Sequence, residues 1–214
     1  GGCLAMASRQ VWHLWMRFGF LFIVWGLAVN SGAGPFRVWL AGVDQGAATA
    51  VALIDGGAPQ LAAFASCIRL LVEGLLPLAI DWQQMLTLMA IGSLLVGNLA
   101  AIAQSNLKRM LAFSTISQMG FLLLGLLSGV VNGNQLNAES AYSASMFYAI
   151  TYVLTTLAAF GIIMLLARAR HESEEISDLA GLNQRSPLYA GVMAIAIFSL
   201  AGLPPVVGFY AKLV

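Results

Sequence analysis

Charged residues are scarce in this sequence. Only 9% of its 214 residues are Asp, Glu, Lys or Arg, whereas 60% are hydrophobic, and the mean hydropathy is +0.86. Soluble domains carry about 25% charged residues, so the composition excludes an ordinary soluble domain. The same balance predicts a polytopic membrane protein, in which most side chains face lipid or one another.

The residues from which many enzyme sites are built are also scarce. The two cysteines, Cys3 and Cys67, lie far apart in the chain, and so do the two histidines, His13 and His171. The sequence contains no metal-spaced set, glycine-rich phosphate loop or nucleophile–base triad. It also lacks a dense cluster of Lys and Arg, which argues against binding to nucleic acid. We therefore expect no metal site.

Long apolar runs predict an all-α fold, a polytopic transmembrane helix bundle of about six helices that forms one domain over residues 1–214. The predicted helices cover residues 11–29, 47–72, 82–103, 108–131, 141–167 and 188 onward. A polar connection at residues 171–187 is expected to be solvated and to hold a short amphipathic helix. A turn is predicted at residues 73–81, which include Pro77.

Two of the predicted helices are interrupted. The sequence Asp55-Gly-Gly-Ala-Pro59 breaks the second helix, and Gly202-Leu-Pro-Pro205 breaks the last one, because glycine and proline together do not continue a regular helix. At membrane depth such a break costs several kcal/mol unless it is buried in protein or lines water. The first break is either a kink in a packed helix or the discontinuous part of a transport path.

The stretch at residues 104–127 joins a cationic pair to a long apolar helix. Lys108 and Arg109 begin this helix, and its first turns carry hydroxyl and amide side chains that need partners inside a bundle. These side chains are Ser114, Thr115, Ser117 and Gln118. The pattern fits a helix beside a wet path, but the residues by themselves favour an interfacial anchor followed by ordinary helix–helix contacts.

Lysine occurs at two positions only, Lys108 and Lys212. Desolvation disfavours the charged form of a lysine, so a lysine in a low-dielectric site binds and releases a proton as its surroundings change. Lys212 follows directly after the second helix break, where unwound backbone could host water. The alternative is a lysine near a helix end that extends its ammonium group to the membrane surface.

Several segments resemble a known family. They are Gln-Ser-Asn-Leu-Lys-Arg-Met-Leu-Ala-Phe-Ser-Thr-Ile-Ser-Gln-Met-Gly at 104–120, Ser-Leu-Ala-Gly-Leu-Pro-Pro-Val-Val-Gly-Phe-Tyr-Ala-Lys at 199–212, Gly-Leu-Asn-Gln-Arg-Ser-Pro at 181–187 and Leu-Leu-Val-Glu-Gly-Leu-Leu-Pro at 70–77. Together they resemble the antiporter-like membrane subunits of respiratory complex I, from about Gly32 to the last residue. The resemblance implies that this chain is a fragment covering about helices seven to twelve of a longer subunit.

The resemblance also implies a function. Subunits of this family carry no redox cofactor, and quinone is reduced elsewhere in the complex, which is the enzyme NADH–quinone oxidoreductase. Their buried lysines and water form a relay that moves protons across the membrane. The implied partners are other membrane subunits of the complex, the lipid bilayer, protons and water, and the implied location is the bacterial inner membrane.

Carrying the family pattern over residue by residue gives a mixed result. Lys212 and Lys108 are present, but Asn30 and Gln60 stand where the pattern has lysines, and Gln118 stands where it has histidine. Neither Asn nor Gln titrates, although both bind water. We therefore expect a proton-translocating subunit whose relay is impaired. The alternatives are a non-conducting structural membrane module and a subunit of a multi-subunit cation/proton antiporter.

Overall fold

The computed structural model describes residues 15, 18–27, 29–30, 32, 38–75, 79–129, 138–167 and 175–213. Within these residues the fold is an all-α bundle, as predicted, and the described part contains no strand beyond an isolated bridge between Asn106 and Glu175. The start of the first predicted helix, Pro77, and the connections at 131–137 and 168–174 lie outside the described residues.

The first break in the chain is confirmed. Helix α3 (Thr49–Asp55) ends where the Gly-Gly pair begins, and α4 (Ala58–Ile68) starts directly after it and continues as a π-helix at Arg69–Gly74. Pro59 occupies the first turn of α4, where a missing N–H costs nothing. Before α3 lies α2 (Val38–Gly46), a helix that the sequence analysis did not predict.

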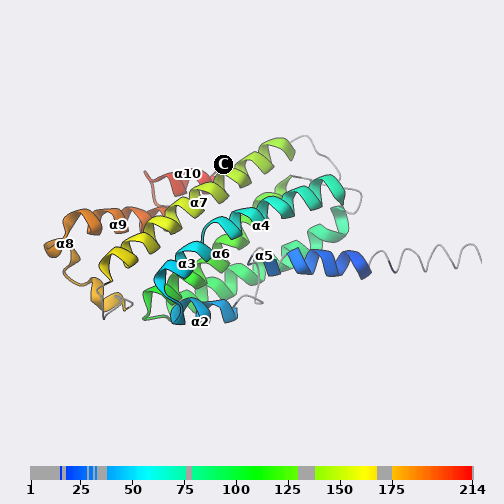
Figure 1. Ribbon diagram of the computed structural model, residues 1–214. Helices are drawn as coiled ribbons and strands as arrows, with labels where there is room; N and C mark the ends of the chain where they lie inside the picture. Colours follow the sequence, from blue (N-terminus) through cyan, green and yellow to red (C-terminus); the bar gives the residue numbers. More distant parts are fainter. Residues whose placement is uncertain are drawn as a thin grey trace, which may run out of the picture.

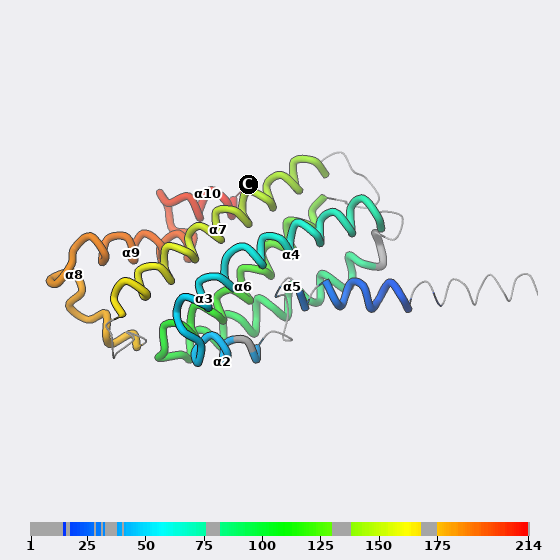
Figure 2. The backbone as a smooth tube through the Cα atoms, viewed as in Figure 1, coloured from blue at the N-terminus to red at the C-terminus, as the bar shows by residue number. Residues whose placement is uncertain are grey.

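The remaining elements follow the predicted order. They are α5 (Ala79–Ile102), α6 (Leu107–Ser128), α7 (Ala138–Leu166), a 3₁₀ turn (Ile176–Leu179), α8 (Leu182–Arg185), α9 (Pro187–Ala201) and α10 (Val207–Leu213). The predicted turn at 73–81 is shorter than expected, because the π-helix reaches Gly74 and α5 begins at Ala79. The second break is also confirmed, since α9 ends at Gly202 in the left-handed conformation, φ +77°. After the break the chain continues beside α7 as α10 (Figure 2).

Helix α6 is the centre of the bundle. It packs against α2, α5 and α7, and α7 in turn packs against α3, α4, α9 and α10 (Figure 1). Of the apolar segment of α6, 67% is buried, against 28% for α5. Four described segments are long and apolar enough to cross a membrane, 49–74, 82–102, 107–128 and 138–166, and two shorter apolar helices lie at 18–27 and 187–201. The chain is therefore a multi-pass membrane protein.

The start of α6 is fixed by a side-chain cap. Asn106 has an extended backbone, and its Oδ1 accepts a hydrogen bond of 3.1 Å from the backbone N–H of Arg109, which satisfies one of the orphan donors of the first turn. The neighbouring Ser105 carbonyl accepts from the N–H of Ile176 at 3.1 Å. The connection before α8 is thereby held against the end of the bundle at which α6 begins.

Gly97 permits the close contact between α5 and α6. A Cβ at this position would lie 2.6 Å from the backbone nitrogen of Ser117 and 3.0 Å from the carbonyl oxygen of Phe113. Both atoms belong to helical backbone, so a larger side chain forces the two helices apart. The Ser117 hydroxyl also donates to Asn98 Oδ1 at 3.0 Å, which ties the same turn of α6 to α5.

We expect Gly97→Ala to destabilise the bundle by about 1–3 kcal/mol, because the added methyl group overpacks a backbone contact. The matched control is Gly161→Ala in α7, where a Cβ meets nothing within 4 Å. Thermal unfolding of the detergent-solubilised protein should show a lower midpoint for Gly97→Ala and an unchanged one for Gly161→Ala. Equal midpoints for the two variants would contradict the close packing of α5 on α6.

Candidate functional site

The second helix break creates the surroundings of Lys212. The last carbonyls of a helix have no intrahelical partner, and Lys212 Nζ donates to two of them at the end of α9, Leu200 O at 2.9 Å and Ala201 O at 3.5 Å. Its ammonium group also lies 4.9 Å from the ring centroid of Phe121 on α6, within the range of a cation–π contact. The half-buried Lys212 is therefore folded back onto the break.

Gln118 connects the same carbonyl to the rest of the bundle. Its Nε2 donates to Leu200 O at 3.0 Å, so this oxygen accepts from both Gln118 and Lys212. Gln118 Oε1 in turn accepts a hydrogen bond from the hydroxyl of Tyr148 on α7. The Gln118 side chain thus joins α6, α7 and α9 through the two ends of one buried amide.

A second hydrogen bond links α6 to α7 one turn further along. The hydroxyl of Tyr152 donates to Thr115 Oγ1 at 2.7 Å, and the Thr115 hydroxyl donates to its own helix at Leu111 O, 3.1 Å away. Thr115 precedes Gln118 by three residues, and Tyr148 precedes Tyr152 by four, so each pair shares one helix face. The two α6–α7 hydrogen bonds therefore lie one above the other inside the bundle.

A small cavity lies beside these hydrogen bonds. It measures about 10 Å³ and is lined by Lys212, Gln118, both tyrosines and Ser199, among others. That volume is at the lower limit of the space one water molecule needs. Lys212 also lines two wider clefts of about 350 and 440 Å³, so it stands between the interior of the bundle and its more open side.

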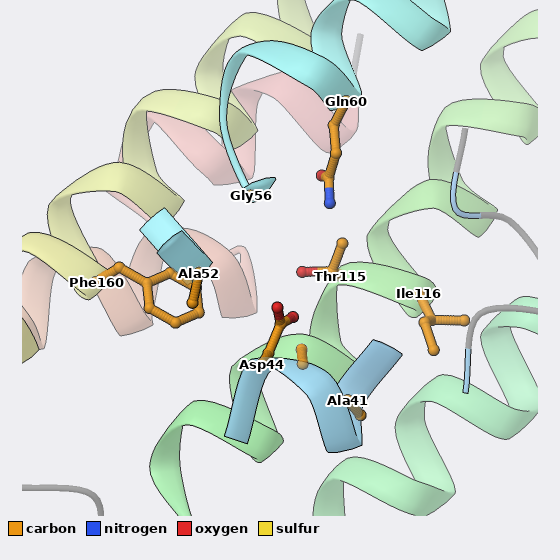
Figure 3. A pocket seen from close by; sticks show the side chains of 9 residues that line it. Ala41, Asp44, Ala52, Gly56, Gln60, Thr115, Ile116 and Phe160 are labelled. Carbon is orange, nitrogen blue, oxygen red and sulfur yellow. The ribbon is translucent and has the colours of Figure 1, made fainter. Parts of the chain in front are cut away.

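A second small cavity, also of about 10 Å³, lies on the other side of Thr115. Asp44 from α2, Gln60 from α4 and Thr115 from α6 point toward one another across it (Figure 3). Gln60 is 2% exposed, and its Oε1 has no hydrogen-bond partner among the described protein groups. Asp44 is 9% exposed. We call the series running from one cavity to the other the polar row: Asp44, Gln60, Thr115, Tyr152, Tyr148, Gln118 and Lys212.

The polar row contains three of the five predicted site residues. Lys212, Gln118 and Gln60 belong to it, although they come from three different helices. Lys108 is 0% exposed in the first turn of α6 and lines none of the four cavities described here. Asn30 is exposed and lines none of them either. Within the described residues no group of three His, Cys, Asp or Glu could hold a metal ion.

Sequence reasoning did not single out Asp44, Tyr152 or Ser199. The signal available for Asp44 was a carboxylate within an apolar segment. Tyr148 and Tyr152 were available as a pair of hydroxyls spaced one helical turn apart. Ser199 accepts from the N–H of Gly208 at 3.2 Å across the break, a contact that no local sequence pattern indicates.

Two of the buried threonines, Thr115 and Thr156, offer a matched test of the α6–α7 hydrogen bond. Thr115→Val removes the oxygen that accepts from Tyr152, and we expect a loss of about 1–3 kcal/mol. Thr156→Val removes a buried hydroxyl whose oxygen has no partner, so stability should stay the same or rise. Denaturant unfolding in detergent micelles measures both, and a larger loss for Thr156→Val would contradict this assignment.

Comparison with protein families gives one match that spans nearly the whole chain. The family model described as NADH:quinone oxidoreductase/Mrp antiporter, TM, matches residues 4–214. NADH-quinone oxidoreductase subunit N from Polaromonas naphthalenivorans (strain CJ2) is 80% identical over 209 residues, which are 98% of this chain and 42% of that protein. The same subunit from Herminiimonas arsenicoxydans is 63% identical, over 92% of this chain and 40% of the relative. This chain thus spans about two-fifths of the length of these curated relatives.

Two solved structures share the fold. The match in respiratory complex I from Thermus thermophilus with bound aureothin has a TM-score of 0.71 and 33% identity, and it covers 88% of this chain and 39% of that one. The Mrp complex from Dietzia sp. DQ12-45-1b also gives a TM-score of 0.71, with 24% identity over 89% of this chain and 34% of the other. At 24% sequence identity, the second match shows a shared fold and nothing about function.

Proposed function

This chain belongs to the NADH:quinone oxidoreductase/Mrp antiporter membrane family, and from that premise we propose that it is part of a proton-translocating subunit of an NADH–quinone oxidoreductase. The polar row is its proton path, and Lys212 is the group that binds and releases the proton. The observation that carries this proposal is the position of Lys212, which contacts the broken end of α9 and lines a small interior cavity together with wider clefts.

The geometry supports a lysine that alternates between two protonation states. The carbonyls of Leu200 and Ala201 and the face of Phe121 stabilise the ammonium form. Apolar surroundings favour the neutral amine, because desolvation penalises charge. The hydroxyls of Tyr148 and Tyr152 both donate and accept hydrogen bonds, so they pass protons between the cavities without titrating themselves.

The relatives favour a complex I subunit over a subunit of a cation/proton antiporter. The relatives reported above are both named NADH-quinone oxidoreductase subunit N, and complex I is the more similar of the two solved structures in sequence. On this proposal the chain works beside other membrane subunits in the bacterial inner membrane and holds no redox cofactor. Quinone reduction takes place elsewhere in the complex and drives the proton through the polar row.

We expect Lys212→Ala and Lys212→Arg, each in the full-length subunit, to lower proton pumping several-fold in the assembled complex. The arginine variant keeps a cation and its donors but does not release a proton, so it separates proton exchange from charge. Protons moved per NADH oxidised are measured in reconstituted vesicles. Arg185→Ala, at an exposed position on α8, is the control. Unchanged pumping in Lys212→Ala would overturn the role given to Lys212.

A non-conducting structural module is the second candidate function. Gln60 occupies the interior cavity with a side chain that does not titrate, and Asn30 is exposed. On this alternative the bundle packs against neighbouring subunits, and the hydrogen bonds between α6, α7 and α9 serve the fold only.

Restoring lysines separates the two functions. In the double variant Asn30→Lys/Gln60→Lys, we expect more protons pumped per NADH oxidised if the chain conducts through an impaired relay. The same vesicle assay measures this ratio, with the amount of assembled complex as the control for folding. Unchanged pumping in an assembled double variant would favour the structural module.

A further inference from the structure

We propose that Asp44 is a second proton-binding group of the polar row. It exchanges a proton with Lys212 through the hydroxyls of Tyr152 and Thr115 and one water molecule in each small cavity, one beside Lys212 and one between Asp44, Gln60 and Thr115. This inference rests on the proposed function, because it names the group at the far end of the same path. It assigns a proton-carrying role to a carboxylate on a helix that the sequence analysis did not predict.

The placement of Asp44 follows from the two faces of α2. Ala41 and Asp44 are three residues apart and share the face that packs on α6, where Ala41 is 1% exposed beside Ala112 and Ile116. The opposite face carries Trp39 and Val43, which are 64% and 50% exposed. A carboxylate on the exposed face would be solvated by its surroundings, whereas Asp44 is turned into the bundle and lines a cavity.

Gln60 gives independent evidence that the cavity binds a polar ligand. A buried amide oxygen without a donor costs about 1–3 kcal/mol, and Gln60 Oε1 has no donor among the described protein groups. The cavity it faces, about 10 Å³, has the size of one water site. A water placed there finds the polar partners it requires, because it can donate to Gln60 Oε1 and exchange hydrogen bonds with Asp44 and Thr115 (Figure 3).

Among the described residues that line this cavity, Asp44 is the one with an acidic or basic side chain. The neighbouring elements also carry charged or titratable groups. These are Asp55 at the end of α3, Lys108 and Arg109 on α6, and Tyr148 and Tyr152 on α7. None of them lines the cavity. Because Gln60 cannot take up a proton, a proton that reaches the cavity water is received by the Asp44 carboxylate.

The exchange conserves every proton. The Lys212 ammonium releases one proton to a water molecule in the small cavity beside Tyr148 and Tyr152 and becomes an amine, and that water passes a proton to the Tyr152 hydroxyl. The hydroxyls of Tyr152 and Thr115 and the water beside Asp44 each accept one proton as they release another. The Asp44 carboxylate takes up the last proton and becomes a carboxylic acid, so both ends of the row are neutral after the step. The reverse sequence restores the charged pair.

Infrared difference spectroscopy on the assembled complex tests the carboxylic acid directly. NADH-driven turnover of the full-length complex should give a carbonyl-stretch band of a protonated carboxyl group that shifts in D₂O. We expect Asp44→Asn to abolish this band and to lower pumping at least as far as Lys212→Ala. Asp44→Glu should restore the band at a shifted position together with part of the pumping. Asp55→Asn is the control, because Asp55 does not line the cavity.

Gln60→Leu provides a second variant that does not alter Asp44. It removes an unpartnered oxygen, so the complex should assemble, and the Asp44 band should shift because the cavity water loses its acceptor. An unchanged band in Asp44→Asn, or no shift in Gln60→Leu, would overturn the inference. Normal pumping in Lys212→Ala would instead overturn the proposed function. Loss of pumping in Lys212→Ala with a normal Asp44→Asn complex would overturn the Asp44 role alone.

Discussion

One carbonyl oxygen, that of Leu200, is the point on which the polar interior depends. It accepts from Gln118 and from Lys212, and it is available because α9 ends at the next residue, Ala201, with Gly202 as its cap. In hydrocarbon each unpaired backbone group costs several kcal/mol, so the break and the two polar side chains stabilise one another. The amide of Gln118 extends the arrangement to Tyr148, and the polar contacts reach from the end of α9 to the middle of α7.

The two helix breaks follow the same physical logic. The first break is buried against α7. The second is exposed at Leu203, Pro204 and Pro205, but the helices on both sides of it, α9 and α10, pack against α7. At the first break, a Cβ on Gly57 would lie 3.1 Å from Leu157, and Gly56 lines the cavity of Asp44 and Gln60. The break therefore packs tightly and also faces a polar cavity, so the two readings of the sequence describe the same feature. Irregular backbone at membrane depth is tolerated where protein or water covers it.

The charge in the interior cavity differs from the family pattern. The resemblance predicts a lysine at position 60, whereas this chain places a neutral amide there and a carboxylate across the cavity at Asp44. An ammonium group and a carboxylate can each hold a proton, but they have opposite charge when ionised. In our proposal this difference moves the proton-binding group from α4 to α2 and leaves Lys212 as the partner at the other end of the row.

Much of this protein is determined by its sequence, because membrane spans and helix breaks are local properties of the chain. Apolar length predicted the spanning helices, and glycine–proline pairs located both breaks, since neither requires knowledge of neighbours. The short helix α2 was missed because a helix of nine residues carries little periodic signal. Which polar residues meet was decided by the tertiary structure alone. Lys212 and Gln118 are 94 positions apart in the sequence, and they share a carbonyl only because the end of α9 lies within hydrogen-bond reach of both α6 and α10. Likewise, Asp44 and Gln60 face one cavity only because α2 and α4 both pack beside α6, and no local pattern encodes that contact.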